Sequence, residues 1–297
     1  MISNSFTQEA CTKHSEDYEV TEMIDYGSFG DIFKVKTVSD NKIYAMKQIK
    51  YRGLFQNDPY IMNEIYCLTH LKHKNIICLH EIIIDTDEIH IIMEYAANES
   101  LDKFLVDHKD MEFHHRYKLF SQTLQGVMYC HDMDVAHRDL TPSNILLTKD
   151  MVVKIADFGL AVKCFTESGE PVYCTDYIGH TSYLAPEVLS QNPFLPKPAD
   201  LWSLGITLLF LIFYSVPYNG LQEDVLKDIL RDTWTTFVES KSKTAGIVVK
   251  QDIVNIVESC LRVKVNSRPS ICDLIREWDN IAPDSLLDTE TFTVGSK

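Results

Sequence analysis

The feature that most constrains how this chain can fold is a set of polar residues at fixed spacing between positions 134 and 159. It comprises His137-Arg138-Asp139, then Asn144 five residues after the aspartate, then Asp157-Phe158-Gly159 thirteen residues after the asparagine. An ordinary turn with polar residues is the alternative interpretation. Several uncommon residues that keep fixed distances along the chain argue strongly against a chance match.

Two apolar runs inside this set, residues 145–147 and 152–153, predict short strands on either side of a turn at Lys149-Asp150. A hairpin of this kind would carry Asn144 and Asp157, which are distant in sequence, to the same wall of a cleft. The sequence therefore predicts one compact site built from both ends of the stretch.

The set resembles the catalytic loop and the Asp-Phe-Gly element of eukaryotic-type protein kinases. Phosphoryl transfer needs little covalent help, so these proteins supply positioning and charge. The resemblance implies that Asp139 accepts the proton of the attacking hydroxyl. It also implies that Asn144 and Asp157 hold Mg²⁺ between the phosphates of ATP.

Residues 18–48 predict strand, turn and strand, and the turn resembles the Gly-rich loop whose backbone covers the ATP phosphates. Asp25 stands where that loop has its first glycine, so a plain hairpin with two turn glycines is an equal alternative. A carboxylate near a triphosphate predicts weaker ATP binding rather than none. The residues of this segment that the resemblance places around the nucleotide are Ile24, Gly27, Ser28, Phe29, Gly30 and Ile32.

The segment Tyr44-Ala45-Met46-Lys47 resembles the kinase strand that carries the phosphate-binding lysine, Lys47 here, and the small Ala45 leaves room for adenine. Glu64 shares the buried edge of a predicted helix and, as a carboxylate there, requires a cation. The resemblance assigns that role to Lys47, as in the ion pair of active kinases. The apolar residues that predict the helix by their spacing are Ile61, Ile65, Leu68 and Leu71.

Residues 76–84 and 88–95 predict two strands joined at residues 85–87. The second strand ends in a segment that resembles a kinase hinge. The resemblance implies that Met93 guards the pocket behind the nucleotide and that the backbones of Glu94 and Ala96 face adenine. It also places Leu146 at the nucleotide.

Helical patterns follow the hinge, and the longest predicts one amphipathic helix that leads to the catalytic loop, with apolar residues at Phe113, Tyr117, Phe120, Leu124 and Val127. Residues 185–187 resemble the end of the kinase activation segment. Residues 200–205 resemble the start of its central helix, so the apolar run 204–216 is expected in the core rather than in a membrane. Arg268 is expected to pair with Glu187, and residues 220–282 should form further helices.

Together these resemblances cover residues 18–281 and imply an α+β fold of two lobes with ATP between them. Residues 18–96 would form a small β-rich N-terminal lobe with one helix, and residues 97–281 a larger, mainly helical C-terminal lobe. Residues 1–17 and 282–297 are expected to be flexible tails. Several phrases, among them Cys130 to Val135, resemble the testis-specific serine kinases.

Besides Asp25, three positions near the catalytic aspartate depart from the family pattern. Serine/threonine kinases have a lysine two residues after the catalytic aspartate, and tyrosine kinases have an arginine four residues after it; Thr141 and Ser143 stand there instead. His180 replaces a threonine that contacts that aspartate and lysine in the family. Losing one charge-stabilising donor can cost roughly 10²–10³ in rate. Pro142 and the residues around His180 still favour a serine/threonine kinase over a tyrosine kinase.

The family motifs that are present, weighed against the departures from them, lead to two candidate functions. The favoured one is an ATP-dependent kinase that transfers the γ-phosphate to serine and threonine hydroxyls of protein substrates, because the core charged residues are all present. The alternative is a pseudokinase that binds nucleotide or serves as a scaffold, to which Asp25, Thr141 and His180 point. A small-molecule phosphotransferase is disfavoured, because the motifs at 185–187 and 200–205 accompany protein substrates in the family.

The activation segment has an acidic residue at the position where the family often carries a phosphate. In the family, an arginine such as Arg138 often binds a phosphate about eleven residues before the glutamate that stands here as Glu187. That position is Asp176, so a carboxylate already stands where the phosphate would be. Phosphorylation of Thr175 is the equal alternative.

Composition limits the classes of binding partner and the cellular compartment that we expect for this chain. The net charge of −15 argues against nucleic acid and acidic membranes as main partners, and the polar N-terminus indicates no signal peptide. The eight cysteines lack metal-binding spacing, so free thiols in a reducing, cytoplasmic compartment are expected, with a redox pair of Cys164 and Cys174 as the lesser alternative. Residues 114–116, His-His-Arg, predict a solvated helix face rather than a metal site. The oligomeric state is open.

Overall fold

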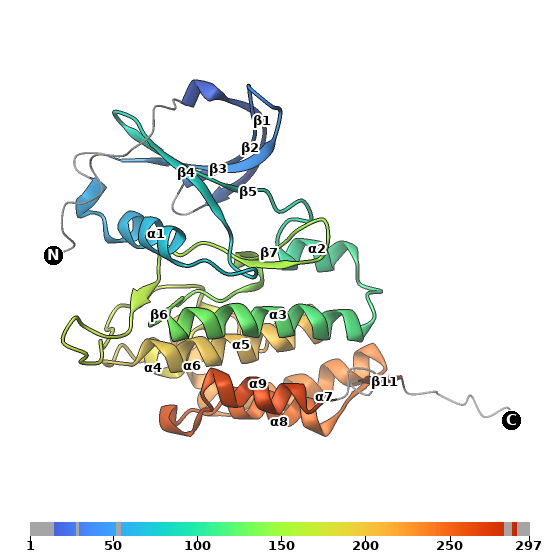
Figure 1. The fold of residues 1–297 in the computed structure, drawn as a ribbon. Coiled ribbons are helices and arrows are strands. Elements are labelled where there is room, and N and C mark those ends of the chain that lie inside the picture. The colour runs from blue at the N-terminus through green and yellow to red at the C-terminus, as the bar shows by residue number, and fades with distance from the viewer. Residues whose placement is uncertain (1–14, 28–29, 52–54, 282–286, 290–297) are drawn as a thin grey trace, which may run out of the picture.

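The computed structural model describes residues 15–27, 30–51, 55–281 and 287–289. Figure 1 shows a lobe of strands with one helix packed above a larger helical lobe. The predicted two-lobed α+β fold is therefore confirmed. The expected flexible tails lie largely outside the described residues, as do Ser28 and Phe29 of the predicted phosphate loop.

The upper lobe is a five-stranded antiparallel sheet in the order β1-β2-β3-β5-β4. Its strands are β1 Tyr18–Gly27, β2 Gly30–Thr37, β3 Ile43–Lys50, β4 Leu79–Ile84 and β5 Glu88–Glu94. Lys47 lies in the central strand, opposite Ile32 on one side and Ile91 on the other, so two ladders fix its backbone.

The single helix of this lobe, α1 (Pro59–His70), begins at a strong N-terminal signal. The Asp58 side chain accepts hydrogen bonds from the backbone N–H groups of Tyr60 and Ile61, and Pro59 occupies the first helical position. Glu64 is buried on the same side as Ile61, Ile65 and Leu68, as the helical spacing predicts.

Strand β4 begins at Leu79, three residues later than the sequence predicts. The two preceding apolar residues are occupied elsewhere, because Ile76 bridges to Ile155 and the Ile77 N–H donates to the Ile155 carbonyl oxygen at 2.9 Å. Both side chains are buried. The first part of this apolar run therefore packs at the junction of the two lobes, and only the second part forms a strand of the sheet.

In its described part, the lower lobe contains eight helices: α2 Leu101–Asp107, α3 Phe113–Asp132, α4 Pro186–Leu189, α5 Pro196–Phe213, α6 Gln222–Leu230, α7 Thr233–Ala245, α8 Gln251–Cys260 and α9 Ile271–Asp279. Helix α5 is the only described helix with the length and apolar composition of a membrane span, and 78% of it is buried within the protein. It is a core helix. It ends three residues before the predicted limit because Tyr214 adopts a left-handed conformation.

Gly205 allows the central helix α5 to lie against α8. A Cβ atom at this position would lie only 2.7 Å from Cys260 Cβ, which no side-chain-bearing residue could tolerate without a shift. The glycine of the predicted central-helix motif is thus required by packing.

Short strand pairs complete the lower lobe. The predicted hairpin is present as β7 Ile145–Leu147 paired with β8 Val153–Ile155, and β6 Val135–Ala136 pairs with β9 Val162–Lys163. The sequence predicts only helices over residues 220–282, but β10 Ile247–Val249 lies among them and pairs with β11 Leu287–Thr289. Residues 287–289 of the expected flexible tail are therefore paired in a ladder.

Arg268 ties the end of the activation segment to the last helices. Its guanidinium donates to both carboxylate oxygens of Glu187, at 2.6 and 2.7 Å, and to the carbonyl oxygens of Arg262 and Pro198. The Arg268 side chain is fully buried. This is the pair that the sequence suggests, in bidentate and desolvated form.

Because Glu187→Ala leaves the Arg268 charge buried without its carboxylate, we expect the free energy of unfolding to fall by about 3–5 kcal/mol. Urea denaturation followed by circular dichroism measures this loss. Arg276→Ala, which removes an exposed pair with Asp273 on α9, is the matched control and should leave the midpoint nearly unchanged. Similar small shifts in both variants would show that the buried pair does not hold these elements together.

Candidate active site

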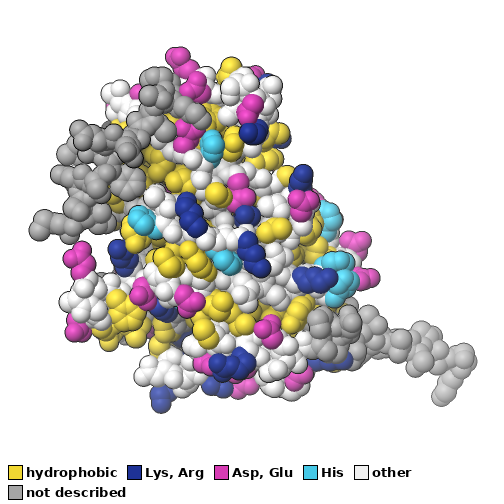
Figure 2. Space-filling model, viewed as in Figure 1, with side chains coloured by type: hydrophobic (Ala, Val, Ile, Leu, Met, Phe, Trp, Pro, Cys, Tyr) yellow, Lys and Arg dark blue, Asp and Glu magenta, His cyan; other side chains and the backbone are white. Residues whose placement is uncertain are grey.

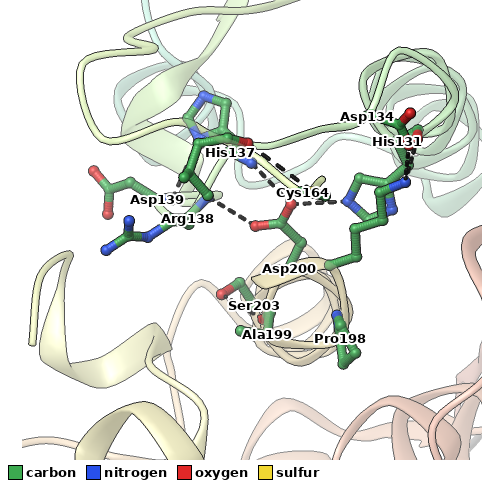
Figure 3. Close-up of polar contacts among 12 residues, drawn as sticks. His131, Asp134, His137, Arg138, Asp139, Cys164, Pro198, Ala199, Asp200 and Ser203 are labelled. Atoms are coloured by element: carbon green, nitrogen blue, oxygen red, sulfur yellow. Dashed lines mark hydrogen bonds and ion pairs between the residues drawn. The ribbon is translucent and has the colours of Figure 1, made fainter. Parts of the chain in front are cut away.

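One buried carboxylate fixes the catalytic loop from the core helix. Asp200 of α5 accepts hydrogen bonds from the backbone N–H groups of His137 at 2.9 Å and Arg138 at 2.8 Å, and it lies 2.8 Å from His131 Nε2. Figure 3 shows Asp200 rising from its helix between these partners. Arg138 has a φ of 69°, an unfavourable backbone conformation for a non-glycine residue. Two consecutive N–H groups aimed at one carboxylate hold the loop in this conformation.

Three charged side chains that are distant in sequence meet at the back of the cleft. Lys47 Nζ lies 2.8 Å from Asp157 Oδ1 and 3.4 Å from Glu64 Oε2. Lys47 and Glu64 are almost completely buried, whereas the Asp157 side chain is 33% exposed and faces the cleft. The structure thus brings together the lysine, the helix carboxylate and the Asp-Phe-Gly carboxylate.

Burial and charge act in opposite directions on this group. Burial opposes the charge of Lys47, but the two carboxylates outweigh it and raise the lysine pKa. Burial also acts to raise the pKa of Asp157, yet Lys47 holds that pKa below its ordinary value. For Glu64 burial dominates, and its pKa is raised. Lys47 is therefore a cation beside an ionised Asp157.

Asp139 is oriented by hydrogen bonds to both of its carboxylate oxygens. Asn144 Nδ2 donates to Asp139 Oδ2 at 2.7 Å and to its carbonyl oxygen at 2.9 Å. The backbone N–H of His180 donates to Asp139 Oδ1 at 3.2 Å. Because the Asn144 amino group donates both of these hydrogen bonds, its amide oxygen is the atom of this side chain that could hold a cation.

A cavity of about 790 Å³ between the lobes is lined by most of the predicted nucleotide residues that the structure describes. Among those that line it are Ile24, Ile32, Ala45, Met93, Glu94, Ala96 and Leu146, together with Asp139, Asn144 and Asp157. Gly30 lines an adjoining cavity of about 290 Å³ that also reaches Lys47 and Glu64. Gly27 pairs with Gly30 at the end of the β1–β2 hairpin.

Other residues line the same cavity without any motif to mark them, among them Tyr60, Glu99, Lys103 and Tyr177. Lys103 is the most consequential, because its Nζ lies 2.9 Å from Asp25 Oδ2. Asp25 was expected to present a bare negative charge to the phosphates, but in the structure a lysine neutralises it. The sequence carried no signal for this contact, since the two residues belong to different lobes.

The positions of the two missing cations are filled by hydroxyl groups. Thr141 Oγ1 and Ser143 Oγ lie 2.7 Å apart, and both residues line the cavity beside Asp139. Among the described residues that line this cavity, Lys47 and Lys103 are the only lysines or arginines. One of the hydroxyls donates a hydrogen bond to the other, and neither supplies positive charge to a transferred phosphoryl group.

The activation segment is held in place by several contacts. Arg138 Nη2 lies 2.5 Å from Asp176 Oδ2, and although burial opposes it, this arginine holds the pKa of Asp176 below its ordinary value. Two residues before Asp176, Cys174 exchanges two backbone hydrogen bonds of 2.9 Å with Phe194. The carboxylate at the position of the expected phosphate is therefore already paired with the arginine.

The structure also locates the residues of the weaker candidate sites. Burial raises the pKa of the Cys164 thiol to about 12 and also raises that of Cys174, so neither is a ready thiolate, and no disulfide joins any described cysteines. Glu112, His114 and His115 lie at or near the surface, and one possible ligand atom from each lies within 4.8 Å of the other two, so these residues could hold a metal ion, which the sequence did not favour. Arg116, predicted to be solvated, is instead buried and donates to the last carbonyl groups of α5, a contact that the adjacent histidines concealed.

The fold and the site together define the class of two-lobed protein kinase domains. The family described as the protein kinase domain matches residues 18–278, and the chain belongs to this family.

Curated relatives agree with this assignment. The chain is 30% identical to the putative sperm motility kinase W of Mus musculus over 93% of its own length and 52% of that protein. It is 31% identical to testis-specific serine/threonine-protein kinase 1 of Mus musculus over 73% of this chain and 59% of the relative. It is 36% identical to serine/threonine-protein kinase SAPK1 of Oryza sativa over 69% and 58%. The chain thus spans little more than half the length of these relatives.

Proposed function

We propose that this chain is an active protein kinase that uses ATP and Mg²⁺ to phosphorylate serine or threonine hydroxyls of protein substrates in the cytoplasm. One observation carries the proposal. Lys47 forms ion pairs with both Glu64 and Asp157 at the cavity. Asn144 donates a hydrogen bond to Asp139 at the same cavity. Protein kinases need both the lysine–glutamate pair and the Asp-Phe-Gly aspartate in place to be active.

The donor set fits a magnesium ion. Carboxylate and amide oxygens are ligands that Mg²⁺ prefers, and the low pKa of Asp157 keeps its carboxylate ionised. Asp157 and the amide oxygen of Asn144 would hold the ion. When bound, it would neutralise charge on the nucleotide phosphates.

We assign the remaining steps of phosphoryl transfer to side chains of this chain. Asp139 is oriented by Asn144 and by the His180 N–H, and it would accept the proton of the substrate hydroxyl. Lys47 would bind the nucleotide phosphates, while Glu64 keeps the ammonium group directed into the cleft. Positioning and charge are the main contributions that phosphoryl transfer requires of a protein.

Radiolabelled ATP, magnesium and a generic protein substrate test the proposal directly. Purified wild-type protein should transfer label to serine and threonine, and Asp139→Asn should not. Asp150→Asn, which changes an exposed carboxylate at the tip of the β7–β8 hairpin, is the matched control and should keep wild-type activity. Label on tyrosine alone, or equal label with wild type and Asp139→Asn, would contradict the proposal.

A nucleotide-binding pseudokinase is the second candidate, because Thr141 and Ser143 leave no cation beside Asp139. It predicts that ATP binds without transfer of phosphate. Binding measured by isothermal calorimetry, set beside the transfer assay, separates the two candidates.

Thr141→Lys should raise kcat by roughly tenfold if the γ-phosphate lacks a positive contact, since one charge-stabilising donor is often worth more than that. The Thr141 side chain lines the cavity, so a longer side chain can extend into it. The double variant Thr141→Lys with His180→Thr is the cleaner comparison, because it reverses both departures from the family pattern together. Unchanged or lower kcat in both variants would mean that another group already fills this role.

A further inference from the structure

We propose that Asp25 and Lys103 form a strap across the mouth of the nucleotide cavity and that this strap sets how long a nucleotide stays bound. The inference rests on the proposed function in one respect, namely that nucleotide binds in this cavity. Asp25 belongs to β1 of the upper lobe, and Lys103 belongs to α2 of the lower lobe. Both line the cavity.

The Asp25 carboxylate is arranged to meet the lysine. Its Oδ1 accepts a hydrogen bond from the neighbouring Tyr26 N–H at 2.8 Å, which leaves Oδ2 for Lys103 Nζ at 2.9 Å. The register of β1 against β2 shifts between Met23 and Asp25, so Ile24 has no partner in the ladder. Such a bulge redirects the side chains around it, and here both Ile24 and Asp25 face the cavity.

The pair changes the charge that a nucleotide meets. The hydrogen bond that Lys103 donates to Asp25 raises the pKa of Lys103, and the charges of Asp25, Glu99 and Asp102 add to this effect. Without Lys103, the mouth would present Asp25 and Glu99 to an incoming polyphosphate without a compensating cation. With Lys103 in place, Asp25 is neutralised at the edge of the cavity that both residues line.

The pair also links the lobes at this edge. Among the described residues, no other ion pair joins β1 or β2 to the lower lobe, since the pairs of Lys34 with Glu22 and of Lys36 with Glu19 stay within the hairpin. For the hairpin to rise and release a nucleotide, the contact between Asp25 and Lys103 must break. The side chains are 51% and 43% exposed, so the strap should be modest in strength and sensitive to salt.

Stopped-flow release of a fluorescent ADP analogue from the full chain tests the strap. Asp25→Asn and Lys103→Met should each release the analogue about two- to fivefold faster, the size expected for a half-exposed ion pair. The exchanged pair, Asp25→Lys with Lys103→Asp, should restore slow release. Lys36→Met, which removes a pair within the hairpin, is the matched control and should behave as wild type.

Three further measurements separate the strap from a general loss of structure. The association rate should fall in Lys103→Met, which exposes Asp25, but should not fall in Asp25→Asn. Hydrogen exchange without nucleotide should quicken in β1 and β2 of both single variants and recover in the exchanged pair. Raising the salt concentration should bring the wild-type release rate toward that of the single variants.

The outcomes are distinguishable. Normal analogue binding with equal release rates in all variants would overturn the strap and leave the proposed function standing. Faster release in the single variants without recovery in the exchanged pair would also overturn it, because the two residues would then act separately. Failure of wild-type protein to bind any nucleotide would contradict both the strap and the proposed function.

Discussion

Lys47→Met is expected to lower phosphoryl transfer at least 10²-fold, because it removes the cation that the cavity directs at the nucleotide phosphates. Lys47 Nζ is held by Asp157 at 2.8 Å and by Glu64 at 3.4 Å, in the central strand of the sheet. Methionine is similar in length and apolar, so it can occupy the buried stem of the lysine. The raised pKa of Glu64 means that this carboxyl can take up a proton once its partner is gone. The fold should therefore survive the change.

Initial rates with radiolabelled ATP measure this effect, and circular dichroism melting curves confirm that the variant is folded. Lys50→Met, an exposed lysine at the end of the same strand, is the matched control and should keep wild-type rates. If Lys47→Met keeps most of its activity while folded, the assignment of Lys47 to the phosphates is wrong.

The second large effect is expected at Asp176. Asp176→Ala should reduce activity by about tenfold or more, because Arg138 then loses the charge-assisted bond that orders the activation segment beside the catalytic loop. Thr175→Ala should change little, and phosphatase treatment of wild-type protein should leave its activity intact. The carboxylate that already binds Arg138 takes the place of a regulatory phosphate in this account.

Asp176→Glu separates charge from geometry, since it keeps the carboxylate and moves it by one methylene group. Partial recovery in this variant would support the ion pair. The opposite pattern, in which phosphatase or Thr175→Ala silences the enzyme and Asp176→Ala is tolerated, would show that the segment depends on phosphorylation. An upstream kinase or autophosphorylation would then be required.

The parts of the fold that local pattern controls were predictable from the sequence. The spacing of Ile61, Ile65 and Leu68 predicts α1, and the apolar runs around Lys149-Asp150 predict the β7–β8 hairpin. The residues of the candidate site could be selected because their chemical types stand at fixed distances along the chain. Residues 76–78 were assigned wrongly to a strand, since their pairing with Ile155 depends on a distant segment.

Contacts between distant segments that no family motif marks could not be predicted. Asp25 and Lys103 meet only because the two lobes close on one cavity, and nothing near either residue marks the other. Arg116 follows two surface histidines, yet it turns inward because the unpaired carbonyl groups at the end of α5 accept its hydrogen bonds. The β10–β11 pair joins segments about forty residues apart, where short apolar runs gave no clear period.

The central claim is that this site transfers phosphate and does not merely bind nucleotide. Its most direct test is a single-turnover reaction in which purified protein is in excess over radiolabelled ATP, with magnesium and a generic protein substrate present. The account predicts that label moves to serine or threonine with wild-type protein and stays on ATP with Asp157→Ala. Wild-type protein that binds ATP yet transfers no more label than Asp157→Ala would contradict it.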